Sequence, residues 1–200
     1  MTQLLWARHG ENVANLSRTF SHRVFDGDLT ERGRAQAERL GQLLASAGSP
    51  IGLIAVSPLK RAVQTAEIVG GHLGLEPELT LDDLREVNVG DLDGRNDDAA
   101  WATYDRILES WRRGRIHERF PTGEDLIDLE TRLRRALVHV VSKAEGRLPL
   151  VVAHGANIRA ALPRLAQVPD PGVDLATGGI ARFTVEADHH GSRIALNSWA

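Results

Sequence analysis

Three short apolar runs, separated by segments with helical periodicity, constrain this chain more than any other feature. The runs occupy residues 4–7, 51–56 and 150–153, and polar residues follow each of them. Short apolar runs that stop at polar or turn residues are typical of strands buried in a parallel sheet. Between the runs, Leu, Ala and Val recur at helical spacing, as in residues 124–145. This alternation predicts an α/β fold with a mostly parallel central sheet.

The rest of the chain supplies further helices and strands for a three-layer sandwich. Helices are expected from Thr30 until Gly48 and Pro50, from Pro58 to Gly70-Gly71, around residues 101–111, over residues 124–145, and from His154-Gly155 to about residue 165. A short strand is expected at residues 78–81, and a C-terminal hairpin at residues 179–185 and 193–197, joined through residues 188–191. Because 200 residues suit a single core, residues 1–200 are expected to form one domain with helices on both faces of the sheet.

Composition and charge exclude several classes of protein. Lys and Arg total 24 and Asp and Glu total 27, so the net charge is −3, which argues against a nucleic-acid or membrane-surface partner. The absence of cysteine excludes disulfides, a thiolate nucleophile and Cys-type metal sites. The N-terminus does not read as a signal peptide, and no apolar stretch approaches the roughly 18 residues of a membrane helix. A cytoplasmic monomer or homodimer is therefore expected.

Polar residues follow the three apolar runs where the expected strands end. Arg8 and His9 follow the first run, Arg61 lies one turn into the helix after the second, and His154 and Gly155 follow the third. Ligands bind outside the carboxyl ends of parallel strands, so these residues are expected to share one cleft. A lone His at a strand end is more often a structural residue, but two His-Gly pairs with arginines nearby favour an anion site.

His9 and Glu86 are the candidate reactive groups of this cleft. Nearby cations disfavour the imidazolium form of His9, which keeps the ring neutral and nucleophilic. Glu86 follows the short strand expected at residues 78–81 and is a candidate general acid, although a Glu in such a place is usually a surface residue. The acidic run at residues 91–98 lacks the glycine position and the bidentate Glu of a calcium loop, so no metal site is expected.

Six blocks of sequence, spread over most of residues 4–160, form a more specific pattern than any single residue. In chain order they are RHGEN, LTERGRAQAERL, SPLKRAVQTAE, LREVNVGDLDG, FPTGED and VVAHGANIRA. RHG alone is a weak signal, whereas the ordered set resembles the histidine phosphatase superfamily, which is also called the phosphoglycerate-mutase-like superfamily.

The resemblance implies a site that transfers a phosphoryl group through a histidine. In that family the His of RHG becomes phosphorylated, two Arg and a second His hold the phosphoryl group, and the Glu of the LRE block protonates the leaving group. The matching residues are His9, Arg8, Arg61, His154 and Glu86, with further phosphate contacts at Asn15 and Ser21 and additional substrate-binding candidates at Gly155 and His22. Two arginines and a protonated His154 would supply the positive charge that metals supply elsewhere, so no cofactor is expected.

Two departures from the family pattern favour its phosphatase branch. Cofactor-dependent phosphoglycerate mutases follow their acid Glu with an Arg and have a Lys eleven residues after that Glu, but here these positions are Val87 and Asp97. Charge for a second phosphate is therefore largely missing, and hydrolysis of a small phosphorylated metabolite is expected. The alternatives are a cofactor-dependent phosphoglycerate mutase, a phosphoprotein phosphatase and a non-catalytic module that binds a phosphorylated ligand.

The segment at about residues 95–125 is expected to form a helical lid over the site. It carries four aromatic residues and four arginines, namely Trp101, Tyr104, Trp111, Phe120, Arg112, Arg113, Arg115 and Arg119. One interpretation is an aromatic and basic wall that contacts the organic part of the substrate. The other is a helix whose aromatic residues pack on the core while its basic face is solvated, and both interpretations stay open on the sequence.

Overall fold

A computed structural model describes residues 2–165, 175–188 and 191–199 of the chain. Its centre is one sheet of six strands in the order β3-β2-β4-β1-β5-β6. The strands are β1 (Thr2–Arg8), β2 (Ile51–Val56), β3 (Leu79–Thr80), β4 (Leu148–Ala153), β5 (Ile180–Asp188) and β6 (Gly191–Trp199). The first four strands of this order run parallel, whereas β5 and β6 form an antiparallel hairpin at the edge. The predicted α/β fold is confirmed.

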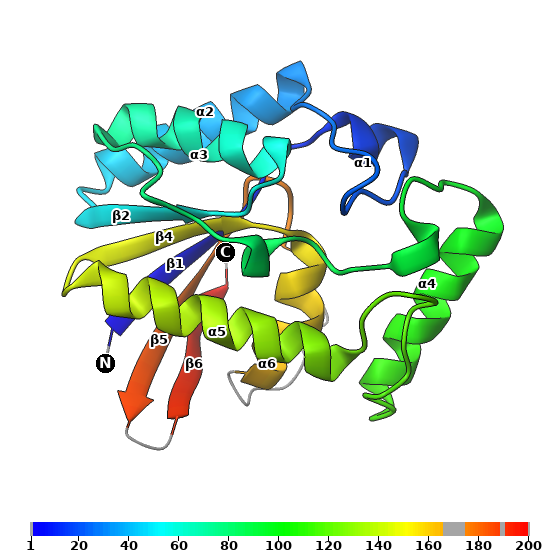
Figure 1. Cartoon of the computed structure of the whole chain (residues 1–200). Helices are drawn as coiled ribbons and strands as arrows, with labels where there is room; N and C mark the ends of the chain where they lie inside the picture. Colours follow the sequence, from blue (N-terminus) through cyan, green and yellow to red (C-terminus); the bar gives the residue numbers. More distant parts are fainter. Residues whose placement is uncertain (1, 166–174, 189–190, 200) are drawn as a thin grey trace.

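Helices cover both faces of the sheet (Figure 1). They are α1 (Val13–Ser17), α2 (Glu31–Ser46), α3 (Lys60–Leu73), α4 (Asp98–Arg112), α5 (Leu126–Ala144) and α6 (Leu162–Leu165), with 3-10 turns η1 (Asp82–Leu84) and η2 (Gly90–Leu92) and a π-helical turn η3 (Asn157–Ala161). Helices α2 and α3 lie on one face and α5 and α6 on the other, while α1 and α4 lie beyond the carboxyl ends of the parallel strands (Figure 1). Among the described residues, no helix is long and apolar enough to cross a membrane.

Successive side chains of β1 are buried on opposite faces of the sheet, so the core has two layers. Leu5 and Ala7 are buried with residues of α2 and α3, whereas Leu4 and Trp6 are buried with residues of α5. Successive side chains of a strand point to opposite faces, so one apolar strand can anchor both layers of helices. The central strands are therefore apolar throughout, as the sequence predicts, and they hold the loops at their carboxyl ends in place.

The boundaries of α3 differ from the prediction at both ends. The helix begins at Lys60 instead of Pro58, and it continues through Gly70-Gly71 until Gly74, which adopts a left-handed conformation with φ +68°. Gly70 is needed inside the helix because a Cβ there would overlap the carbonyl of Leu75, where the chain turns back. Gly70 therefore reflects close packing, and the glycine pair does not mark the end of the helix.

The predicted helix after β4 and the predicted C-terminal hairpin are both present. The helix expected after His154-Gly155 consists of the π-helical turn η3 followed by α6. The hairpin joined through residues 188–191 is present as β5 and β6, and its tip at residues 189–190 lies outside the described residues. Helix α1 was not predicted, because its five residues are too few to show a periodic pattern.

A glycine–glycine contact fixes the loop after β1 against the start of α2. A Cβ on Gly10 would overlap the carbonyl of Gly33, and a Cβ on Gly33 would overlap the carbonyl of Glu11. Thr30 caps α2 by accepting a hydrogen bond from the Gly33 N–H at 3.0 Å. The backbone that follows His9 is therefore held by contacts that only glycine permits.

Substitution of these glycines tests the packing. Gly33→Ala is expected to lower the free energy of unfolding by about 1–3 kcal/mol, because the added methyl group must displace the Glu11 backbone. Gly71→Ala is the matched control: its Cβ would meet open space inside α3, so the free energy of unfolding is expected to rise by up to about 1 kcal/mol. Urea denaturation measures both changes, and an unchanged stability of Gly33→Ala would contradict the close contact.

Candidate active site

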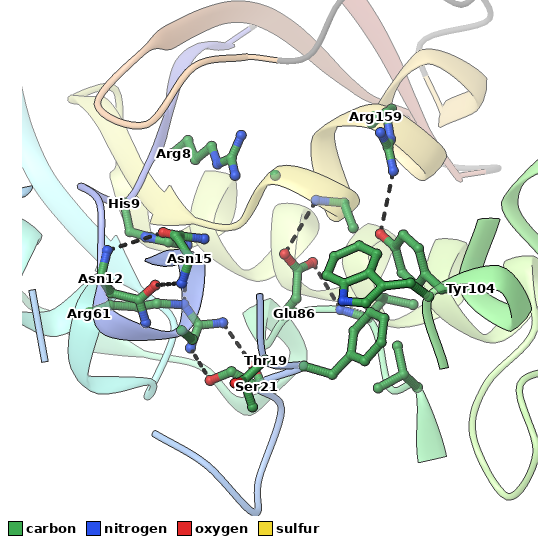
Figure 2. A pocket seen from close by; sticks show the side chains of 17 residues that line it. Arg8, His9, Asn12, Asn15, Thr19, Ser21, Arg61, Glu86, Tyr104 and Arg159 are labelled. Atoms are coloured by element: carbon green, nitrogen blue, oxygen red, sulfur yellow. Dashed lines mark hydrogen bonds between the residues drawn. The ribbon is translucent and has the colours of Figure 1, made fainter. Parts of the chain in front are cut away.

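One pocket of about 240 Å³ gathers residues from segments far apart in the sequence (Figure 2). It is bordered by the loop after β1, the residues around α1, the start of α3, the loop that follows η1, helix α4 and the turn after β4. Seven predicted site residues line it: Arg8, His9, Asn15, Ser21, Arg61, Glu86 and Gly155. The two others, His22 and His154, are buried beside it.

His9 is buried, and its hydrogen bonds define one tautomer. Its Nδ1 lies 2.6 Å from the Gly10 carbonyl oxygen, which can only accept, so Nδ1 carries the proton. Its Nε2 accepts a hydrogen bond from Arg61 Nε at 3.1 Å. Burial, followed by the charges of Arg61 and Arg8, lowers the pKa of His9 well below its usual value. The ring is therefore neutral with its lone pair on Nε2, as the neutral nucleophile predicted from sequence requires.

Arg61 lies in the first turn of α3 and is almost completely buried. Besides His9, its guanidinium donates to Ser21 Oγ and to the Ser21 carbonyl, both at 2.9 Å. Burial lowers the pKa of Arg61 to about 10, so the side chain remains a cation at neutral pH. It therefore places a fixed positive charge beside Nε2 of His9.

The side chain of Arg8 lies against the turn after β4, and its position requires a glycine at residue 155. Its Nη1 donates to the Leu175 carbonyl at 2.7 Å, while its buried Nε has no hydrogen-bond partner among the described residues. A Cβ on Gly155 would lie 2.8 Å from Arg8 Cζ and Nε. Gly155 therefore lets the guanidinium lie against the backbone of this turn, and the unpaired Nε is a donor suited to an anion.

His154 is fully buried, with its ring centroid 5.2 Å from that of His9. Its Nε2 shares a 2.7 Å hydrogen bond with Ser57 Oγ, and its Nδ1 has no partner within the described part of the chain. Burial is the main reason that the pKa of His154 falls well below its usual value, and the charge of Arg61 adds to it. The sequence predicts a protonated ring here. The structure instead gives a neutral one, because burial and the neighbouring cations both oppose another positive charge.

Glu86 is half-buried in the loop between η1 and η2. Its Oε1 accepts a hydrogen bond from the Val87 N–H at 2.9 Å, and its Oε2 accepts one from the Ala156 N–H at 3.3 Å. In Figure 2 the carboxylate lies between the side of the pocket that holds His9 and the side that holds Tyr104. Among the described residues that line the pocket it is the one carboxylate, so it is placed to exchange a proton there.

Asn15 and Ser21 line the pocket, whereas His22 does not. Asn15 Oδ1 accepts a hydrogen bond from the Asn12 N–H in the capping box of α1, and Ser21 Oγ donates to the Phe25 carbonyl at 2.5 Å. The sequence places His22 in the mouth of the pocket. The structure corrects this: its ring lies behind Glu86, and its Nδ1 donates to the Glu86 carbonyl at 2.9 Å.

The backbone explains the different position of His22. Both carboxylate oxygens of Asp93 accept hydrogen bonds from backbone N–H groups of the loop, namely those of His22, Arg23 and Val24. These bonds turn the chain after Ser21, so that the next side chain packs under the loop that carries Glu86. A contact over some seventy residues of sequence could not be read from local pattern.

The segment at residues 95–125 contributes aromatic residues to the pocket but not its arginines. Trp101 and Tyr104 of α4 line it together with Phe20, whose ring centroid lies 4.4 Å from that of Trp101. Trp111 and Phe120 are buried in the core. The four arginines form ion pairs with acidic residues of the same segment and of the start of α5: Arg112 and Arg113 with Glu109, Arg115 with Glu118, and Arg119 with Asp125 and Asp128. The aromatic half of the predicted wall is therefore present and the basic half is absent.

One charged residue of the pocket was not predicted. Arg159 of η3 lines it, and its Nη2 lies 3.4 Å from the Tyr104 hydroxyl oxygen. Its position five residues after His154, on the turn that follows the second His-Gly pair, is the signal that could have identified it.

The described residues contain no group of three or more His, Asp or Glu side chains arranged to hold a metal ion.

The sequence matches known proteins over most of its length. A family model for the histidine phosphatase superfamily (branch 1) matches residues 4–199. The chain is 34% identical over 193 residues to a 2,3-bisphosphoglycerate-dependent phosphoglycerate mutase of Azorhizobium caulinodans, which covers 92% of this chain and 93% of that protein. It is 36% identical over 163 residues to a probable phosphoglycerate mutase GpmB of Erwinia tasmaniensis, covering 78% of this chain and 70% of the other.

The fold also matches solved structures. A mycobacterial glucosyl-3-phosphoglycerate phosphatase in complex with VO3 superposes with a TM-score of 0.79 at 25% identity, covering 100% of this chain and 99% of the other. A putative alpha-ribazole-5'-P phosphatase of Escherichia coli gives a TM-score of 0.74 at 25% identity, covering 98% of this chain and 96% of the other. Because the family model spans nearly the whole sequence and the curated relatives share a third of their residues with it, this chain belongs to the histidine phosphatase superfamily.

Proposed function

We propose that this enzyme is a metal-independent phosphomonoester hydrolase that forms a phosphohistidine at His9. The observation that carries the proposal is the state of the His9 ring, which is neutral, holds its proton on Nδ1 and has its lone pair on Nε2. Arg61 lies beside this nitrogen and Arg8 lines the same pocket, so their two positive charges suit the two negative charges of a phosphomonoester. A nucleophile, an anion site and a carboxyl group therefore share one pocket.

The reaction proceeds in two displacements at phosphorus. His9 Nε2 attacks in line, the new P–N bond forms as the P–O bond to the leaving group breaks, and Glu86 gives its proton to the departing oxygen. Water then attacks the phosphohistidine, Glu86 takes a proton from that water, and inorganic phosphate leaves. Arg61 must exchange its hydrogen bond with Nε2 for one with a phosphoryl oxygen as the lone pair is used.

His154 has a different part in this scheme from the protonated group expected on the sequence. A neutral ring still donates one hydrogen bond, and its unpartnered Nδ1 is the nitrogen that is not used by Ser57. A phosphate dianion nearby favours the protonated form, so substrate binding is expected to raise the pKa of His154. Asn15 and Ser21 complete the polar lining around the phosphoryl group.

The leaving-group side of the pocket supports hydrolysis of a small molecule. It is lined by Phe20, Val87, Trp101 and Tyr104, which offer apolar surface to an organic group. A volume of about 240 Å³ is less than the roughly 300–1,000 Å³ of pockets for drug-sized ligands, which favours a small metabolite over a phosphoprotein. The presence of nucleophile, acid and both arginines in one place argues against a non-catalytic binding module.

A phosphoglycerate mutase is the second candidate function. It is favoured by the curated relatives, which carry that name at 34–36% identity. Against it stand Val87 and Asp97, at the positions where the sequence analogy requires Arg and Lys. Asp97 caps α4 through the Ala100 N–H and pairs with Arg95, so it adds no positive charge for a second phosphate.

Replacement of His9 tests the nucleophile. His9→Ala is expected to lower kcat/KM for a phosphomonoester on the order of 10⁴-fold, because the substitution removes the nitrogen that attacks phosphorus in the first displacement. His139→Ala, on the exposed side of α5, is the control and is expected to keep wild-type activity. Release of inorganic phosphate measures both, in the presence and absence of EDTA. Wild-type turnover by His9→Ala would refute the phosphohistidine route, and loss of activity with EDTA would refute its metal independence.

The protonation state of His9 gives a second test. Because its pKa is lowered, protonation starts at a more acid pH than in an ordinary His, so the ring is expected to remain neutral at pH 6.5. ¹⁵N NMR of labelled protein distinguishes protonated Nδ1 from unprotonated Nε2. A His9 ring that is half-protonated near pH 6.5, or that carries its proton on Nε2, would contradict the assignment.

The fate of the phosphoryl group separates hydrolase from mutase. With labelled 2,3-bisphosphoglycerate and unlabelled 3-phosphoglycerate, the label is expected in inorganic phosphate, because the pocket lacks the two basic positions named above. His9→Ala provides the background rate. Transfer of label into monophosphoglycerate faster than its release as phosphate would establish the mutase instead.

A further inference from the structure

The loop that carries Glu86 is held by a buried ion pair that does not touch the pocket. We propose that Arg132 of α5 and Glu124, which precedes that helix, position Glu86 for proton transfer. This inference rests on the proposed role of Glu86 as acid and base. The side chains of Arg132 and Glu124 are 14% and 9% exposed, and neither lines the pocket.

All five N–H donors of Arg132 are used. Nη1 donates to the carbonyls of Asp83 and Arg85 at 2.7 and 2.8 Å, and Nη2 donates to the Glu86 carbonyl at 3.0 Å. Nε and Nη2 donate to the two carboxylate oxygens of Glu124 at 2.9 and 2.7 Å. Only a planar guanidinium offers this number of donors in this arrangement, so a Lys would leave carbonyls of the loop unpaired.

Glu124 extends the same contact to the other side of Glu86. Its Oε1 accepts a hydrogen bond from the Asn88 N–H at 2.8 Å, and its own N–H donates to the Asn88 carbonyl at 3.0 Å. The ion pair therefore holds backbone groups both before and after Glu86. It fixes a stretch that has only the short turns η1 and η2 as regular structure.

Two further side chains support the same loop. Asn157 Nδ2 donates to the carbonyls of Leu84 and Arg85 at 3.2 and 2.9 Å, and His22 Nδ1 donates to the carbonyl of Glu86. The Glu86 carbonyl thus accepts from both Arg132 and His22. With its backbone fixed in this way, the carboxylate is directed between the N–H groups of Val87 and Ala156.

Stability alone does not account for this arrangement. Removing two charges from water costs about as much as their attraction returns, so a buried pair adds little net stability compared with apolar residues. A proton donor, in contrast, must lie within hydrogen-bond distance of the departing oxygen, and a displacement of about 1 Å can cost on the order of 100-fold in rate. Positioning of Glu86 is the role that this geometry fits.

The dependence of rate on the leaving group tests the proposal. Phenolate is a poor leaving group and needs a proton, whereas 2,4-dinitrophenolate leaves without one, so only phenyl phosphate requires a positioned acid. Arg132→Lys and Arg132→Met are expected to lower kcat/KM for phenyl phosphate by about 10- to 100-fold and that for 2,4-dinitrophenyl phosphate by less than about threefold. Glu86→Gln is the reference and is expected to show the same selective loss.

Arg135→Met is the matched control for Arg132→Met. Arg135→Met removes an exposed pair with the Asp83 side chain on the same turn, and is expected to change neither rate by more than about twofold. If Arg132→Met does not fold, Arg132→Lys and the near-isosteric Glu124→Gln carry the comparison, with thermal denaturation confirming the folded state.

Two results would contradict the proposal, and they differ in whether the role of Glu86 as the acid also fails. Equal loss on both substrates for the Arg132 variants, with a selective loss for Glu86→Gln, would show a merely structural pair and overturn the positioning role alone. If Glu86→Gln itself loses no selectivity, Glu86 is not the acid, and both the proposed mechanism and the positioning role fail.

Discussion

Two arginines and two histidines share a small buried volume at the carboxyl ends of β1 and β4. Their proximity determines the protonation states of the histidines, on which the rest of the site depends. Burial, followed by the positive charge of Arg61, lowers the pKa of both His9 and His154 well below the usual value, so both rings are neutral. The Gly10 carbonyl then fixes the proton of His9 on Nδ1. The burial and positive charge that suit an anion therefore also keep the proposed nucleophile neutral.

The fold supports this cluster by contacts of the backbone more than by side chains. Parallel pairing of β1 with β4 brings Arg8 level with Ala153, so that the residues that follow both strands are neighbours. Glycines allow the close approaches on either side, with Gly10 against Gly33 and Gly155 against Arg8. Glu86 comes from a loop, and there the ion pair of Arg132 with Glu124 takes the place of a regular element.

The sequence predicts those parts of the molecule that depend on local pattern. Strand β2 matches its predicted bounds, and α2 begins after the predicted cap Thr30. Four of the polar residues at strand ends line one pocket, and the fifth, His154, is buried beside it. The predictions that fail depend on partners distant in sequence. Gly70 faces the returning chain at Leu75, and His22 is turned away from the pocket by Asp93. The charge of His154 depends on burial among arginines from three other elements, which no local pattern records.

The proposed mechanism depends on transfer of the phosphoryl group to Nε2 of His9, and the position of the phosphorus on the ring tests this step. The phosphoenzyme can be trapped with a rapidly reacting aryl phosphate and examined by ³¹P and ¹⁵N NMR of protein labelled in its histidines. One phosphohistidine is expected, at residue 9, with phosphorus on Nε2 and a proton retained on Nδ1 facing the Gly10 carbonyl. Phosphorus on Nδ1, or on any residue other than His9, would contradict it.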